Sequence, residues 1–152
     1  MTLIIKQADE DYGLAQQSDS DFVFPVPVPF NTHIIRGMLH LSAPAGVGID
    51  FSLEWEVLPA LPFAFLTCTY LGADTDGHVW NSGLLTNPLT VAVDSGFDAY
   101  IGIQGQVQKS TPSAVPGSIT LLGNAINALN SPAIITMKAG SWIEVVDSGV
   151  IV

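Results

Sequence analysis

The side chains best suited to catalysis or metal binding are few and widely spaced in this sequence. The histidines, His33, His40 and His78, include no two at a spacing that brings metal ligands together on one strand or helix. The motifs of serine hydrolases, phosphate-binding loops and zinc proteases (G-x-S-x-G, G-x-x-x-x-G-K and H-E-x-x-H) are also absent. We therefore expect no metal, no cofactor and no enzymatic activity.

Two groups of carboxylates come closest to a chemical site. Asp74 and Asp76 precede Gly77 as at the start of a calcium-binding loop, but the third oxygen ligand and the later bidentate glutamate are missing. Glu54 and Glu56 share one strand face about 7 Å apart, a separation that glycosidase pairs can use. The sequence shows no apolar pocket around either glutamate that would raise its pKa, as a general acid requires. We interpret the first group as a turn and the second as a solvated strand face.

Trp80 is the tryptophan best placed to bind a ligand. It follows His78 in the polar segment 72–83, which we expect to be a loop. An exposed tryptophan ring can stack on a sugar, and Asp74 and Asp76 would supply polar groups beside it. These three residues form a candidate ligand platform.

The composition limits the classes of partner. Of 152 residues, 48% are hydrophobic and only 12% charged, and the net charge is −10. Nucleic acids and anionic membranes are disfavoured because phosphate binding needs clustered cations, and no apolar run reaches the roughly 20 residues that span a bilayer. A weakly charged, apolar-leaning surface favours burial against another subunit. The four cations to which this argument applies are Lys6, Arg36, Lys109 and Lys138.

The chain has a single cysteine, Cys68, which excludes an intrachain disulfide.

Residues 49–57 carry the clearest strand pattern in the chain. Ile49, Phe51, Leu53 and Trp55 alternate with polar residues, which predicts a half-buried antiparallel strand with these side chains in the core.

Segment 22–30 also alternates, and its pattern directs Phe22 and Phe24 toward the core. Pro25 and the two prolines that follow at every second position remove backbone donors on one side of the strand. We therefore predict an edge strand, or alternatively an extended arm that lies on another surface.

The remaining pattern predicts an all-β chain. Further strands are expected at 3–6, 34–42, 63–70, 89–93, 97–107, 118–123, 133–138 and 142–146, while 124–130 fits either a helical turn or a strand. About eight or nine short strands with glycine and proline between them predict an antiparallel β-sandwich of jelly-roll type. We place this domain at 22–152. Residues 1–21 are predicted to be an N-terminal strand followed by an acidic loop or arm at 7–21.

Several segments together resemble a known family. These are the acidic start leading into 14–22, then 24–28, 32–39 and 45–51, and the closing hairpin 139–146. They are similar to segments of small jelly-roll virion proteins of tailed bacteriophages. The resemblance implies a capsid decoration, cement or head-fibre protein that forms a homotrimer and binds the phage major capsid protein on the capsid surface. It also implies synthesis in the host bacterial cytoplasm, and it carries over no catalytic residue.

The resemblance directs attention to two groups of contact residues. Oligomer-interface candidates lie on the outward face of the longest predicted strand and are Tyr100, Gln104 and Gln106. Capsid-contact candidates lie in the acidic arm and are Asp9, Glu10, Asp11 and Tyr12. The alternative function is a carbohydrate- or receptor-binding β-sandwich module of fibre-tip type, which would use the platform at Trp80.

Overall fold

The computed structural model describes most of the chain in nine ranges. These are residues 2–26, 31–44, 49–58, 63–72, 80–84, 89–93, 98–108, 117–126 and 134–150.

The described residues form strands and no helix. Nine strands have five residues or more, and three shorter ones (β1, β2 and β11) complete the set. The strands are β1 (Thr2–Ile5), β2 (Glu10–Tyr12), β3 (Gln17–Val26), β4 (Asn31–Ser42), β5 (Ile49–Leu58), β6 (Phe63–Gly72), β7 (Trp80–Leu84), β8 (Leu89–Val93), β9 (Asp98–Gln108), β10 (Gly117–Ile126), β11 (Ile135–Met137) and β12 (Trp142–Val150).

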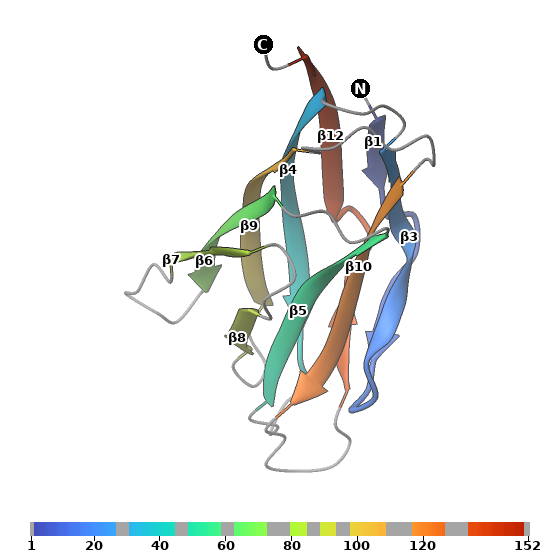
Figure 1. The fold of residues 1–152 in the computed structure, drawn as a ribbon. Coiled ribbons are helices and arrows are strands. Elements are labelled where there is room, and N and C mark those ends of the chain that lie inside the picture. The colour runs from blue at the N-terminus through green and yellow to red at the C-terminus, as the bar shows by residue number, and fades with distance from the viewer. Residues whose placement is uncertain are drawn as a thin grey trace.

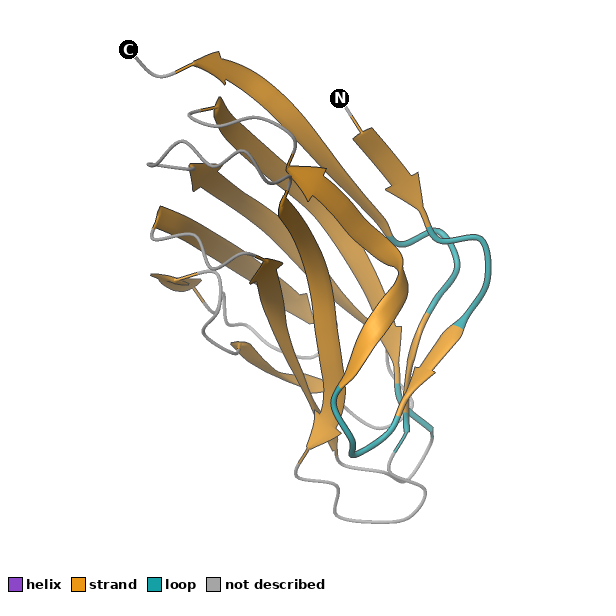
Figure 2. Cartoon of the chain, turned by 45° about the vertical axis from the view of Figure 1, so that its right-hand side comes forward, coloured by secondary structure: helices purple, strands orange, loops and turns teal. Residues whose placement is uncertain are grey.

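The strands assemble into two antiparallel sheets that form two layers (Figures 1 and 2). The larger sheet has the order β1-β12-β4-β9-β6-β7, with β11 pairing both β4 and β2. The smaller sheet has the order β3-β10-β5-β8. The prediction of an all-β, antiparallel, sandwich-like fold is therefore confirmed.

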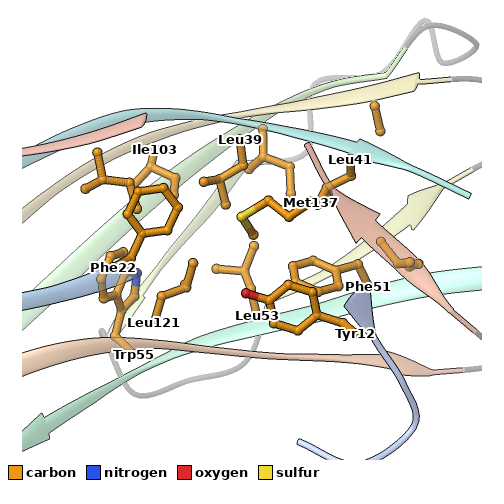
Figure 3. Close-up of a cluster of buried hydrophobic side chains, with 14 of the residues drawn as sticks. Tyr12, Phe22, Leu39, Leu41, Phe51, Leu53, Trp55, Ile103, Leu121 and Met137 are labelled. Carbon is orange, nitrogen blue, oxygen red and sulfur yellow. The ribbon is translucent and has the colours of Figure 1, made fainter. Parts of the chain in front are cut away.

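The core lies between the two sheets, and both contribute to it (Figure 3). In β5 the residues predicted to face inward are buried, with Phe51 0% and Trp55 1% exposed. The opposite sheet supplies Leu39 and Ile103. Alternation with period two explains this, because one face of each sheet packs on the core while the other carries the intervening side chains.

The edge-strand prediction for segment 22–30 is confirmed over the described part of the segment. Phe22 and Phe24 are fully buried, and Pro25 is exposed. β3 stands at the end of the smaller sheet and pairs only with β10 among the described strands. A proline is tolerated there because an edge strand has one side without a ladder partner.

The loop or arm predicted at 7–21 is wrong in part. β2 occupies 10–12 and the first half of β3 occupies 17–21, whereas 7–9 and 13–16 lie outside strands, and β3 crosses the boundary placed between residues 21 and 22. The sequence pattern did not indicate the first half of β3 because its inward-facing residue is Asp19, whose carboxylate accepts hydrogen bonds from Lys6. Pattern reading expects a hydrophobic residue at such a position.

A second loop prediction, at 72–83, is wrong at both ends. Gly72 is the last residue of β6, and Trp80 is the first residue of β7, which pairs with β6. The undecided segment 124–130 begins as a strand, because β10 continues to Ile126. Its remaining residues lie outside the described ranges.

Candidate functional site

The outer face of the larger sheet is the first candidate surface. Its side chains alternate along each strand with the buried ones, and the strand register places them side by side. Arg36, for example, is directly opposite Glu144 on one side and Gln104 on the other. We call this surface the outer face; it comprises Leu3, Ile5, Ile34, Arg36, Met38, His40, Tyr100, Gly102, Gln104, Trp142, Glu144 and Val146.

Exposed apolar side chains gather on the outer face. Among residues with described side chains, six large hydrophobic ones are exposed, and four of the six lie here. They are Leu3 (49% exposed), Ile5 (47%), Ile34 (37%) and Tyr100 (41%). Such a concentration on one side of a domain is typical of a contact surface.

The ion pair between Arg36 and Glu144 lies near the centre of the outer face. The Nη2 and Nε atoms of Arg36 both donate to Oε2 of Glu144, at 2.6 and 3.0 Å. The pair cancels its own charge, so this part of the surface is nearly neutral although the chain carries a net charge of −10. A neutral patch on an acidic molecule is the surface on which another acidic molecule meets least repulsion.

Trp142 is flanked by two open hollows. One, of about 250 Å³, is lined by Arg36, Gly37, Gly102, Ile103, Gln104 and Trp142. The other, of about 350 Å³, is lined by Leu3, Ile5, Trp142 and Glu144. These hollows can receive side chains of a partner, because they combine apolar walls with a few polar groups.

His40 and Tyr100 lie opposite each other at one end of the outer face, near the start of β9. The rings of His40 and Tyr100 stack with centroids 4.6 Å apart and planes inclined by 18°. His40 Nε2 lies 2.9 Å from Oδ2 of Asp98. Tyr100 is thus held in place by its neighbour and remains partly exposed.

A second candidate site is a charged cluster beneath the N-terminal strands. Lys6 follows β1 directly, and its side chain is 0% exposed. Its Nζ donates to Asp21 at 2.9 Å, to both oxygens of Asp19 at 3.1 and 3.2 Å, and to Glu10. The Tyr12 hydroxyl also donates to Asp19. We call these five residues the Lys6 cluster.

Burial and charge act in opposite directions on the Lys6 cluster. Burial alone lowers the pKa of Lys6, but the hydrogen bonds to Glu10 and Asp21 and the charge of Asp19 outweigh it and raise that pKa above its ordinary value. Burial raises the pKa of Tyr12, and the hydrogen bond to Asp19 raises it further. In this arrangement Lys6 is an ammonium and Tyr12 a neutral donor.

The Lys6 cluster does not fit a metal ion. One carboxylate oxygen from each of Glu10, Asp19 and Asp21 lies within 4.8 Å of the others, which is close enough to share a cation. The Lys6 ammonium already bonds all three carboxylates. The positive charge that a metal would supply is therefore provided by the chain itself.

The interface candidates fall on the outer face as far as they are described. Tyr100 and Gln104 are exposed there. Gln106 lies in β9 opposite Ile34, and its side chain is outside the described part of the structure.

The capsid-contact candidates are engaged within the chain. Asp9 pairs with Lys138 and accepts the backbone N–H of Ala139 at 2.8 Å. Asp11 accepts the hydroxyl of Thr136 at 2.6 Å. Glu10 and Tyr12 belong to the Lys6 cluster, and Tyr12 is a core residue with 0% exposure. Asp9 and Asp11 remain exposed, whereas Tyr12 has no surface with which to contact a partner.

The ligand platform is described only at one residue. Trp80 begins β7, and only its backbone is described, while Asp74 and Asp76 lie outside the described residues.

Sequence reasoning did not identify the central residue of either site, Trp142 on the outer face or Lys6 in the Lys6 cluster. Trp142 was not singled out because apolar residues occur on both phases of its strand, but Glu144, which shares the phase of Trp142, was the signal that this phase faces outward. Lys6 did carry a signal, as it is the only cation before Arg36 and is followed by Glu10, Asp19 and Asp21.

Comparison with known proteins assigns no family to the chain. No family model matches it, and no curated protein matches it. Within the described ranges there is also no helix of the length and apolarity needed to cross a membrane.

Proposed function

We propose that this protein is a non-enzymatic structural component of a bacteriophage virion, which binds the outside of the capsid as a decoration or cement protein and assembles as a homotrimer. The observation that carries the proposal is the outer face, where four of the six exposed large hydrophobic side chains with described positions surround a self-neutralised ion pair. The resemblance of several segments to small phage virion proteins supports it.

The strand order favours a jelly roll as the specific form of the sandwich. Strands β3, β5, β8 and β10 lie in the smaller sheet, and β4, β6, β7 and β9 lie in the larger one. The chain therefore passes repeatedly from one sheet to the other, and the two orders β3-β10-β5-β8 and β4-β9-β6-β7 correspond to two interleaved Greek keys.

The outer face is the proposed contact between copies of the chain. Two molecules with a net charge of −10 repel each other, so their contact is favoured where the local charge is cancelled. Arg36 and Glu144 provide that cancellation, and Ile34 and Tyr100 provide apolar area beside it. In a homotrimer the hollows beside Trp142 would receive side chains of the neighbouring copy.

The acidic N-terminal end is the proposed contact with the phage major capsid protein. Asp9 lies in the segment between β1 and β2, Asp11 lies in β2, and both are exposed. Binding at the capsid surface stabilises the shell because the protein binds the assembled form. Three copies linked together would add their weak contacts to one coat lattice.

The oligomeric state is the first test. Light scattering on the purified protein should give the mass of a trimer, and Ile34→Asp should lower it to that of a monomer. Val23→Asp is the matched control, since Val23 is 45% exposed but lies on β3 in the smaller sheet. A monomeric wild-type protein, or equal dissociation of both variants, would contradict the proposed interface.

Capsid binding is the second test. The protein should co-sediment with capsids of the phage that encodes it, prepared without this component. Asp9→Lys combined with Asp11→Lys should weaken binding while the trimer persists. Co-sedimentation that is unchanged in this double variant would exclude the N-terminal acidic contact.

Trp142 favours one alternative, a carbohydrate- or receptor-binding module. Its ring is half-buried between two hollows that also expose Gln104 and Glu144, an arrangement suited to stacking on a sugar and bonding its hydroxyls. Glycan-array binding that is lost in Trp142→Ala would favour this function at the outer face. Loss in Trp80→Ala would instead favour the platform predicted around Asp74 and Asp76.

A further inference from the structure

The Asp19 carboxylate is surrounded by the groups that an acyl-transfer reaction needs. Oδ1 accepts the backbone N–H groups of Asp21 and Phe22 at 2.8 and 2.9 Å. Two such donors on one oxygen stabilise the negative charge that develops there when a nucleophile adds to the carboxyl carbon. Oδ2 accepts a hydrogen bond from the hydroxyl of Tyr12, which makes this oxygen a better leaving group.

A nucleophile and a base stand beside the same carboxylate. Lys6 Nζ lies 3.2 Å from Oδ1 and 3.1 Å from Oδ2 of Asp19, so it is held beside the carboxyl group within hydrogen-bond distance of both oxygens. Glu10 accepts a hydrogen bond from the same nitrogen and can take up its proton. The side chains of Lys6 and Asp19 are both 0% exposed, so bulk water does not compete for the carboxyl carbon.

We propose that Lys6 and Asp19 join in an intramolecular isopeptide bond, formed once per chain by the folded protein itself. Lys6 is the nucleophile and Glu10 the base. The backbone N–H groups of Asp21 and Phe22 form the oxyanion hole, and Tyr12 assists the departure of Oδ2.

The reaction balances without a further reagent. The Lys6 ammonium and the Asp19 carboxylate together carry no net charge and are converted to one neutral amide and one water molecule. The Nζ–Cγ bond forms, and the Cγ–Oδ2 bond breaks. Two ammonium protons leave with Oδ2 as water after passing through Glu10, and the third remains as the amide N–H.

The protonation state of Lys6 determines the rate of the reaction. The pKa of Lys6 lies above its ordinary value, so the amine form is scarce and each attempt requires transfer of a proton to Glu10 within the cluster. The side chain of Glu10 is 18% exposed and offers that proton and the departing water a route to solvent. We therefore expect conversion to continue after folding is complete.

The bond would join the two sheets at one side of the sandwich. Lys6 directly follows β1, which is the last strand of the larger sheet, and Asp19 lies in β3, which is the last strand of the smaller one. In Figure 1 the two strands run side by side near the N-terminus, and β1 and β3 are in contact. A covalent link there would prevent the N-terminal strand from separating from the rest of the domain.

Intact mass is the decisive measurement and requires no variant. The wild-type protein, kept in native buffer until its mass is constant and then denatured, should be lighter than its sequence mass by one water molecule. Peptide mapping should recover a branched peptide that contains both Lys6 and Asp19. A full sequence mass would overturn the proposal, as would a deficit that maps elsewhere, such as a succinimide at Asp76-Gly77.

Variants identify the roles of the residues. Lys6→Arg should abolish the deficit, and Glu10→Gln should slow or abolish it while the protein remains folded by circular dichroism. Lys138→Arg is the matched control, because Lys138 also pairs with an aspartate, Asp9, but both side chains are partly exposed. A deficit that persists in Lys6→Arg, or disappears in Lys138→Arg, would overturn the assignment.

Discussion

Two groups of paired charges in this protein use the same chemistry in opposite surroundings. In the Lys6 cluster the cation is 0% exposed and contacts three carboxylates, whereas Arg36 on the outer face is 56% exposed and contacts one. A buried ion pair is costly to break because the remaining charge is left without water, while an exposed pair is nearly neutral in stability. The first group therefore holds the fold together, and the second leaves its surface free for a partner.

Replacing Lys6 should have the largest effect. Lys6→Met leaves the Asp19 carboxylate in the core without its cation, and we expect a loss of about 3–5 kcal/mol in the free energy of unfolding, measured by urea denaturation. Any covalent link to Asp19 would be lost as well and would add to the decrease. If Lys6→Met and Arg36→Met were equally stable, burial would not be what separates the two groups.

Gly123→Ala tests the packing that holds Tyr12 in the Lys6 cluster. A Cβ at Gly123 would lie 2.6 Å from Cζ of Phe51 and 3.0 Å from Cε1 of Tyr12, whose rings meet edge to face. We expect a loss of about 1–3 kcal/mol by the same measurement, because the overpacked rings must shift. Gly13→Ala is the control, since nothing lies within 4 Å of a Cβ placed there. An equal effect at both glycines would refute the close packing.

Alkaline pH should weaken the buried region through Tyr12. Its folded-state pKa is raised above the ordinary 10.0, first by burial and then by the hydrogen bond to Asp19. The unfolded chain therefore loses this proton first, so the contribution of Tyr12 to stability is complete below pH 10.0 and is lost as pH rises further. In Tyr12→Phe, the fall of unfolding free energy above that pH should be shallower by up to about 1.4 kcal/mol per pH unit. Identical slopes in the two proteins would show that Tyr12 ionises normally.

Arg36→Met should have the smallest effect on the fold. The Arg36–Glu144 pair is largely solvated, so the free energy of unfolding should change by less than about 1 kcal/mol, and by less still at high salt. The same variant leaves Glu144 uncompensated on the outer face, and the trimer mass in light scattering should fall. A large loss of stability with an unchanged mass would reverse the roles given to the two groups.

Pattern reading was reliable where burial and hydrophobicity coincide. The alternation of Phe51, Leu53 and Trp55 predicted both the strand and its buried face, because apolar side chains at period two have one way to pack. Tyr100 and Gln104 were correctly directed outward for the same reason.

Pattern reading failed where polar residues occupy the interior. The buried Asp19 carboxylate is paired with Lys6, which lies at the end of another strand, and no local pattern contains that pairing. The exposure of Leu3 and Ile5 could not be read either, since an uninterrupted apolar run does not reveal which face meets solvent. Both depend on contacts between segments that are distant in sequence.

The position of the Lys6 cluster has a mechanical consequence. A pull on β1 along its axis loads its pairing with β12, which extends over four residue pairs, in shear. Beyond Ile5 the load passes to Lys6, and from there through Asp19 into β3 and its partner β10. The two sheets then share the force, and a tether attached near the N-terminus would be held by the whole sandwich instead of by its weakest edge.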